Sequence, residues 1–159
     1  MIKNILSFFK GFSYAFKGII YCIKTQRNMR FHICAMGAVI FLSGFYELSR
    51  GECALLALVF ASVISSEAVN TAVECAVDLT SKGERSFLAE KAKDCAAGAV
   101  LISAVFAAAA GIFLFWDMDV FRSIYLFFAE KPVYILAVII YIALSIFFIF
   151  EINNNERKE

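Results

Sequence analysis

Four long apolar segments constrain the fold of this chain more than any other feature; they cover about residues 31–48, 53–77, 95–116 and 133–150. A helix of about 20 apolar residues spans the hydrocarbon core of a bilayer, and the first and last segments are near the short limit for such a span. Hydrophobic residues make up 62% of the sequence, well above the usual share in a soluble domain. We therefore expect an all-α integral membrane helical bundle.

The basic residues are distributed unevenly between the two sides of this expected bundle. If the N-terminus is cytoplasmic, that side receives twelve of the 15 Lys and Arg residues, and the other side receives three, Arg50, Arg122 and Lys131. Cytoplasmic loops of membrane proteins carry such an excess. We expect both termini to be cytoplasmic in a multi-pass protein of the plasma membrane. The net charge of +1 gives no reason to expect a nucleic-acid partner.

Residues 3–28 form a segment of a different kind. Lysines recur there every seven residues, at positions 3, 10, 17 and 24, and apolar residues fill the intervals. This pattern predicts an amphipathic helix that lies in the membrane interface with its lysines toward the headgroups. Such a helix is either a simple anchor or a cover over a lipid-headgroup site.

A polar stripe interrupts the second apolar segment at Glu67, Asn70, Glu74 and Asp78. At about 100° per residue these four positions lie on one face of a helix. Ionisable groups are costly inside a membrane and mark a functional site by default. The two glutamates are separated by two turns, about 10 Å, which suits a general base and a metal ligand. Phosphoryl transfer, a proton relay and simple helix packing all remain compatible with this pattern.

The same residues resemble a known family. Residues 67–78 read E-A-V-N-T-A-V-E-C-A-V-D and are similar to the signature E-x-x-N-[ST]-A-[IV]-E-x-x-V-D of the bacterial diacylglycerol kinase and undecaprenol kinase family. Residues 14–18, 27–32 and 92–100 agree with further family blocks in order and spacing, and 27–32 resembles the undecaprenol kinase branch. The resemblance covers about residues 8–116.

The resemblance implies a lipid kinase domain over residues 1–118, with a surface helix at about 3–28 and three core transmembrane helices. The family forms homotrimers whose active sites lie at the cytoplasmic face and are shared between neighbouring subunits. ATP, with Mg²⁺, would phosphorylate the terminal hydroxyl of a membrane lipid alcohol, with undecaprenol as the first expectation and diacylglycerol as the second. Residues 119–159 would then be a linker, an additional C-terminal transmembrane helix at about 133–150 and a polar tail.

The resemblance also assigns roles to individual residues. Glu67 would be the general base, and Glu74 would bind the metal together with Gln26. The expected nucleotide contacts are Tyr14, Asn70, Asp78, Glu84, Lys93 and Asp94. The expected lipid contacts are Lys17, Asn28, Arg30 and Gly98.

Two features depart from the family pattern. Gln26 stands where many members carry a glutamate, so it offers a carbonyl oxygen to a metal but no negative charge. The segment 81–87 lacks the Tyr and His of the E-Y-H-like turn that is usual in the family. These departures motivate an alternative expectation, a catalytically inactive family member that acts as a lipid- or partner-binding membrane scaffold.

Overall fold

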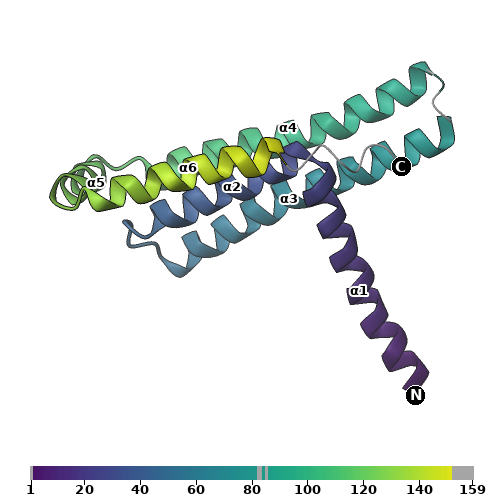
Figure 1. Ribbon diagram of the computed structural model, residues 1–159, viewed down its shortest axis with the longest axis horizontal. Coiled ribbons are helices and arrows are strands. Elements are labelled where there is room, and N and C mark those ends of the chain that lie inside the picture. The colour runs from purple at the N-terminus through teal and green to yellow at the C-terminus, as the bar shows by residue number, and fades with distance from the viewer. Residues whose placement is uncertain (1, 82–83, 85, 152–159) are drawn as a thin grey trace.

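The computed structural model describes residues 2–81, 84 and 86–151, and within these ranges it contains helices and no strand. The expected all-α membrane bundle is thereby confirmed. The polar tail 152–159 and the loop residues Lys82 and Arg85 lie outside the described residues. The helices are α1 (Ile2–Thr25), α2 (Arg27–Ser43), α3 (Arg50–Ser81), α4 (Phe87–Phe115), α5 (Met118–Glu130) and α6 (Val133–Glu151) (Figure 1).

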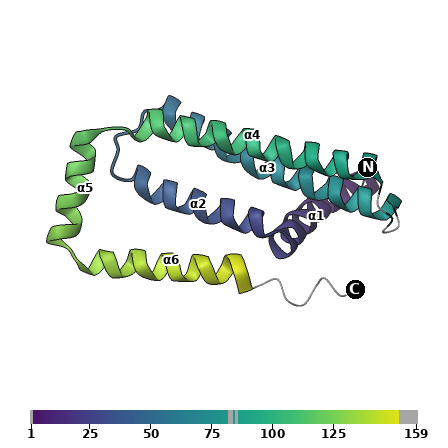
Figure 2. The same cartoon turned by 90° about the horizontal axis from the view of Figure 1, so that it is seen from above.

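The two longest helices, α3 and α4, run side by side at one side of the bundle, and α2 lies between this pair and α6 (Figures 1 and 2). The hydroxyls of Ser66 and Ser103 lie 2.9 Å apart and link these helices within their apolar segments. Helix α2 packs along α3, and α6 packs along α2. Helix α1 leaves the bundle at an angle from the point where α2 begins (Figure 1). The polar stripe of α3 is therefore positioned by helices on either side of it.

Three helices are long and apolar enough to cross a membrane by length and composition: α3, α4 and the Val133–Phe150 part of α6. The expected first span at 31–48 differs in its bounds, because α2 covers Arg27–Ser43 and has 17 residues. Its beginning follows the extended backbone of Gln26 (φ −104°, ψ 115°), which separates it from α1. At 1.5 Å per residue, α2 is about 25 Å long and falls short of the hydrocarbon thickness.

The segment expected to be a plain linker contains the helix α5. The Asp117 carboxylate caps its first turn by accepting hydrogen bonds from the backbone N–H groups of Asp119 and Val120, at 2.9 and 3.1 Å. Such capping satisfies donors that have no partner within the helix. Phe127 of α5 packs against Phe45 and Tyr134, with ring centroids 5.2 and 5.0 Å apart. Helix α5 thus crosses one end of the bundle and joins α4 to α6 (Figure 2).

The additional C-terminal helix docks closely on α2. The Tyr141 hydroxyl of α6 donates a hydrogen bond to the backbone carbonyl of Cys34, at 2.6 Å. Gly37 makes room for this contact, since a Cβ atom at that position would lie 2.6 Å from the Tyr141 hydroxyl oxygen. Most other side chains of α6 are exposed, as expected for a helix that faces lipid.

Candidate functional site

The polar stripe of α3 is buried in the bundle at Glu67 and Asn70, half-buried at Glu74 and exposed at Asp78. Glu67 and Thr71 are each 1% exposed, and Asn70 is 6% exposed. The Thr71 hydroxyl donates to the backbone carbonyl of Glu67 at 2.9 Å, so it satisfies its own donor within the helix. The stripe therefore presents buried polar atoms to the neighbouring helix α2.

Glu67 has one satisfied and one free carboxylate oxygen. The side chain of Asn28, in the first turn of α2, is hydrogen-bonded to the carboxylate. The Oε2 atom is buried and has no hydrogen-bond partner among the residues that the structure describes. An unsatisfied buried acceptor costs about 1–3 kcal/mol and calls for an explanation. A general base requires an oxygen that is free to accept a hydrogen bond from the group it deprotonates.

Glu74 is held by two amides. Its Oε2 accepts a hydrogen bond from Nε2 of Gln26 at 3.2 Å, and its Oε1 accepts one from Nδ2 of Asn70 at 3.1 Å. Gln26 reaches this position because it forms the break between α1 and α2, 48 residues earlier in the chain. The structure thus brings together Gln26 and Glu74, the expected metal ligands, and Asn70, an expected nucleotide contact.

The side chains of Gln26, Asn70 and Glu74 suit a metal ion that is coordinated by phosphate oxygens as well as by protein. No group of three or more His, Cys, Asp and Glu residues that could hold a metal occurs within the described ranges. Mg²⁺ commonly uses one or two protein carboxylates and completes its coordination with water and phosphate oxygens. The Glu74 carboxylate with the amide oxygens of Gln26 and Asn70 is such a set, and Oδ1 of Asn70 is buried without a partner among described residues. A permanently bound metal would need more charge than this set carries.

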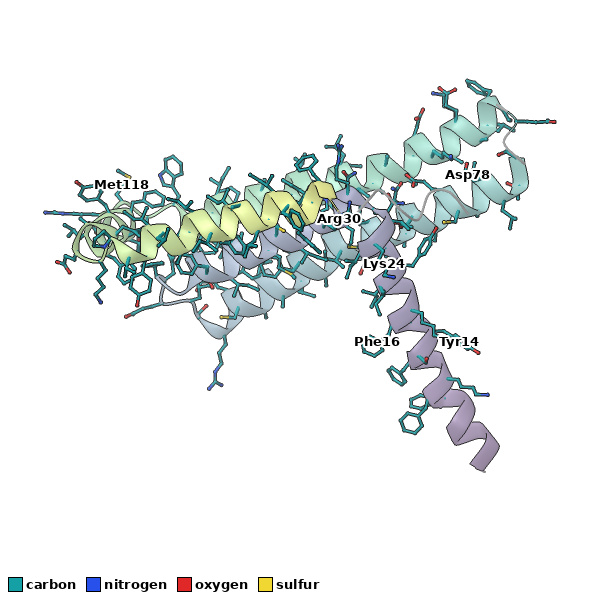
Figure 3. The ribbon with its side chains drawn as sticks, in the orientation of Figure 1. Tyr14, Phe16, Lys24, Arg30, Asp78 and Met118 are labelled. Carbon is teal, nitrogen blue, oxygen red and sulfur yellow. The ribbon has the colours of Figure 1, made fainter. Side chains whose placement is uncertain are left out.

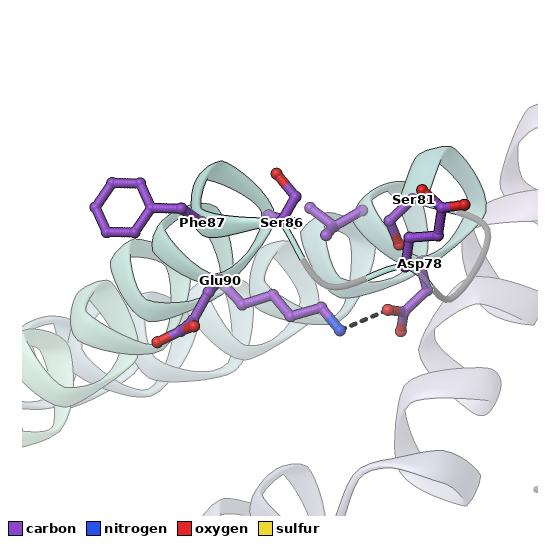
Figure 4. A pocket seen from close by; sticks show the side chains of 9 residues that line it. Asp78, Ser81, Ser86, Phe87 and Glu90 are labelled. Carbon is purple, nitrogen blue, oxygen red and sulfur yellow. Dashed lines mark hydrogen bonds and ion pairs between the residues drawn. The ribbon is translucent and has the colours of Figure 1, made fainter.

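A cavity of about 540 Å³ opens where the 81–87 loop joins α3 to α4 (Figure 4). It contains three of the expected nucleotide contacts, Asp78, Glu84 and Lys93. The Lys93 ammonium is paired with the Asp78 carboxylate, with Nζ and Oδ1 2.5 Å apart. The full lining is Val77, Asp78, Ser81, Glu84, Ser86, Phe87, Ala89, Glu90 and Lys93.

The charges of this cavity limit how it binds an anion. Among the residues that the structure describes, its lining includes the carboxylates of Asp78, Glu84 and Glu90 and the ammonium of Lys93. These carboxylates would repel a triphosphate unless a divalent cation accompanied it. The sequence analysis missed Glu90, although it lies three residues before Lys93 and so on the same helix face.

A second, apolar cavity of about 320 Å³ lies between α2, α3 and α4. Val63, one turn before Glu67 on α3, is part of its wall, as are Phe31 and His32 of α2. The remaining wall consists of aliphatic, aromatic and small residues of the same three helices. The cavity therefore offers a hydrocarbon-like environment that reaches to within one helical turn of Glu67 along α3.

The structure does not bring the expected contacts of the surface helix to this site. Tyr14 and Lys17 are exposed on the part of α1 that projects from the bundle, with the Lys17 ammonium 5.9 Å from the Tyr14 ring centroid (Figure 3). Asp94 is paired with Lys91, at 2.9 Å. A Cβ atom on Gly98 would meet nothing within 4 Å.

Arg30 has a different environment from the lipid contact that we expected. Its side chain is fully buried, and all its hydrogen bonds in the described structure go to backbone carbonyls: those of Ile23, Lys24 and Ile149. The guanidinium therefore contacts helix ends in place of a headgroup. Sequence reasoning could not find these partners, because a backbone carbonyl is present at every residue.

The chain is similar to known proteins over most of its length. The sequence profile described as prokaryotic diacylglycerol kinase matches residues 13–115. The chain is 44% identical to a diacylglycerol kinase of Synechocystis sp. over 101 residues, which are 64% of this chain and 58% of that protein. It is 40% identical to an undecaprenol kinase of Bacillus subtilis (strain 168) over 108 residues, 68% of this chain and 87% of that protein. No solved structure is a significant match.

Proposed function

Because the chain belongs to the prokaryotic diacylglycerol kinase family, we propose that it is a lipid kinase that transfers the γ-phosphate of ATP to a membrane lipid alcohol. The observation that carries this proposal is the free, buried Oε2 of Glu67 on the same helix as Glu74 and the cavity residue Asp78. A base, a cation ligand and a phosphate-binding ammonium are the main parts that phosphoryl transfer needs.

Glu67 acts as the general base in this proposal. The lipid hydroxyl donates a hydrogen bond to Oε2, which has no other donor among the described residues. The hydroxyl oxygen forms a bond to the γ-phosphorus while the bond from that phosphorus to the β–γ bridging oxygen breaks, and ADP leaves. The proton passes to Glu67. Because an alcohol is a far weaker acid than a glutamic acid, the proton moves late, as phosphoryl transfer proceeds.

Glu74 and Gln26 would hold the magnesium ion that accompanies ATP. The ion would neutralise charge on the phosphate oxygens. Lys93 contacts phosphate, and Asp78 keeps its ammonium in place. Glu84 and Asp94 contribute to the nucleotide site. Since Glu67, Glu74 and Asp78 follow one another along a single helix, the lipid approaches from the membrane side and ATP from the opposite end.

Undecaprenol is the proposed substrate and diacylglycerol the second candidate. The block 27–32 and the relative from Bacillus subtilis, 87% of which is covered by the alignment, support this order. The apolar cavity that reaches to within one helical turn of Glu67 suits a hydrocarbon chain. Asn28, Gly98 and Lys17 remain the proposed lipid contacts.

We further propose a homotrimer with shared sites and with both termini in the cytoplasm. The exposed Tyr14 and Lys17 support sharing, because they lie on a helix that projects away from its own chain's site (Figure 3). The open space at Gly98 supports it as well. The bias of basic residues supports the orientation.

The test is transfer of labelled γ-phosphate from Mg-ATP in mixed micelles, with undecaprenol and diacylglycerol offered separately. We expect transfer to at least one of these alcohols, with undecaprenol preferred. A folded protein that transfers phosphate to neither would refute the proposal. Stabilisation by ATP without any transfer would instead favour the inactive scaffold, an alternative to which the comparisons give no support.

A further inference from the structure

Arg30 joins the ends of two helices that are distant in the sequence. Its Nη1 donates to the carbonyls of Ile23 and Lys24, each at 2.9 Å, at the end of α1. Its Nε and Nη2 donate to the carbonyl of Ile149, at 3.3 and 3.0 Å, at the end of α6. The side chain is 0% exposed. One guanidinium therefore bridges α1 and α6 through backbone atoms alone (Figure 3).

The chemistry of helix ends explains this arrangement. The last four carbonyls of a helix have no partner within it and carry the negative end of the helix dipole. Two such ends converge on Arg30, so among the described residues backbone carbonyls compensate the buried positive charge. The planar guanidinium has donors on several edges and can serve both ends at once, whereas the compact ammonium of a lysine can serve one end at a time.

The end of α6 contributes a specific contact rather than general packing. Ile149 is the buried residue of this helix within Val133–Phe150, and the ring centroid of Phe150 lies 5.9 Å from the Arg27 guanidinium carbon. The Tyr141 bond to the Cys34 carbonyl fixes α6 further along α2. The C-terminal turn of α6 is therefore placed against the first turn of α2, which follows Gln26.

Gln26 connects this contact to the candidate site. In the sequence, Gln26 lies between Arg30 and the residues whose carbonyls Arg30 binds, Ile23 and Lys24. The side-chain amide of Gln26 donates a hydrogen bond to the Glu74 carboxylate. We infer that α6, through the Ile149 carbonyl and Arg30, holds Gln26 against Glu74 and thereby sets the affinity of the site for its divalent cation. Arg30 is a positioning residue in this arrangement. The cation-binding part of the inference rests on the proposed function, whereas the mechanical part does not.

Helix α6 lies outside residues 13–115, the region that the family profile covers. The inference therefore assigns the appended helix a role in the reaction beyond anchoring the chain. It also explains how a chain with Gln26 in place of a glutamate keeps its weak ligand in position.

The accessibility of the Cys22 thiol reports how firmly the junction between α1 and α2 is held in place. Cys22 is 7% exposed, and its carbonyl accepts a hydrogen bond from the Gln26 backbone N–H at 2.8 Å. The full-length protein is prepared with Cys22 as its single cysteine, and its rate of labelling by a water-soluble maleimide is measured in detergent. The second readout is the Mg²⁺ concentration that gives half of the thermal stabilisation produced by ATP, which requires no turnover.

Two variants loosen the contact from opposite sides. Arg30→Lys keeps the charge but removes the bridge. Ile149→Gly combined with Phe150→Gly frays the end of α6 and leaves Arg30 intact, since glycine is a poor helix former. The control is Ile135→Gly combined with Leu136→Gly, two exposed apolar residues replaced by glycine near the opposite end of the same helix.

We expect both test variants to speed Cys22 labelling about tenfold and to raise the half-stabilising Mg²⁺ concentration about fivefold or more. The control should change neither quantity. Unchanged labelling in the frayed variant would overturn the role of α6. Faster labelling with an unchanged Mg²⁺ requirement would show that the contact between Arg30 and Ile149 only stabilises the fold. That result would overturn the role of Arg30 in positioning Gln26. If ATP and Mg²⁺ fail to stabilise the wild type, the proposed function fails. The rate of Cys22 labelling still decides whether α6 holds the junction between α1 and α2 in place.

Discussion

Replacing Glu67 by glutamine separates a catalytic from a packing role for this residue. The side chain is 1% exposed and keeps a carbonyl oxygen for the Asn28 hydrogen bond after the substitution. The new amide N–H₂ replaces the free Oε2 and leaves a buried donor group without a partner, at a cost of about 1–3 kcal/mol. In return the substitution removes a buried carboxylate, whose desolvation penalty is several kcal/mol when it is charged.

The two effects on folding therefore oppose each other, and we expect Glu67→Gln to unfold at the same temperature as the wild type or at a higher one. The effect on the reaction is one-sided, because glutamine cannot accept the hydroxyl proton. Loss of a general base lowers rates by about 10²- to 10⁴-fold. This corresponds to about 2.7–5.4 kcal/mol in the activation free energy.

The assay is labelled phosphate transfer in mixed micelles, with thermal unfolding measured on the same preparations. Glu47→Gln, at an exposed position between α2 and α3, is the matched control and should keep full activity. Glu67→Asp withdraws the carboxylate by one methylene group and should lose activity in part, since small misplacements slow such reactions. Activity of Glu67→Gln within tenfold of the wild type would refute the assignment, and so would a loss of activity that accompanies unfolding.

Three further predictions concern the metal, the nucleotide and the appended helix. Gln26→Glu should lower the Mg²⁺ concentration for half-maximal activity roughly threefold or more, because a second carboxylate then faces the cation; an unchanged requirement would remove Gln26 from the metal site. Lys93→Met should raise KM for ATP about tenfold or more, as expected when a charged hydrogen bond is lost, and an equal rise in KM for the lipid would contradict the assignment. Tyr141→Phe should lower the free energy of unfolding by about 0.6–1.7 kcal/mol with activity kept, and an unchanged unfolding curve in a denaturing-detergent titration would show that the 2.6 Å bond to Cys34 does not secure α6.

Much of the candidate site could be predicted from the sequence because the chemistry is arranged along one helix. Glu67, Asn70, Glu74 and Asp78 share a face by helical periodicity alone, and the structure shows the first two buried with free acceptor atoms. Whether Glu67 is a base, a relay or a packing residue was not decided by that periodicity. The family motif made the choice among these roles.

The bounds of the short helices were harder to predict. The segment 119–132 combines charged residues with Pro132, a composition that indicates a linker between two membrane spans. In the structure, most of this segment belongs to α5, and Asp117 caps the first turn of that helix. The amphipathic helix of 13 residues stays helical because Phe127 packs against Phe45, which lies just beyond the end of α2, and against Tyr134 at the start of α6. Such a helix depends on tertiary packing more than on its own propensity.

The sequence by itself determined the class of fold, the three long apolar helices α3, α4 and α6, and the face of α3 that carries the acids. These features follow from local periodicity and from the length of apolar runs, which are properties of neighbouring residues. Only the tertiary structure decided that Gln26 meets Glu74 and that Arg30 binds the ends of α1 and α6. The partners of Arg30 are backbone carbonyls, one of them 119 residues away. Every residue has such a carbonyl, so only the packing of the helices selects the one that is bound.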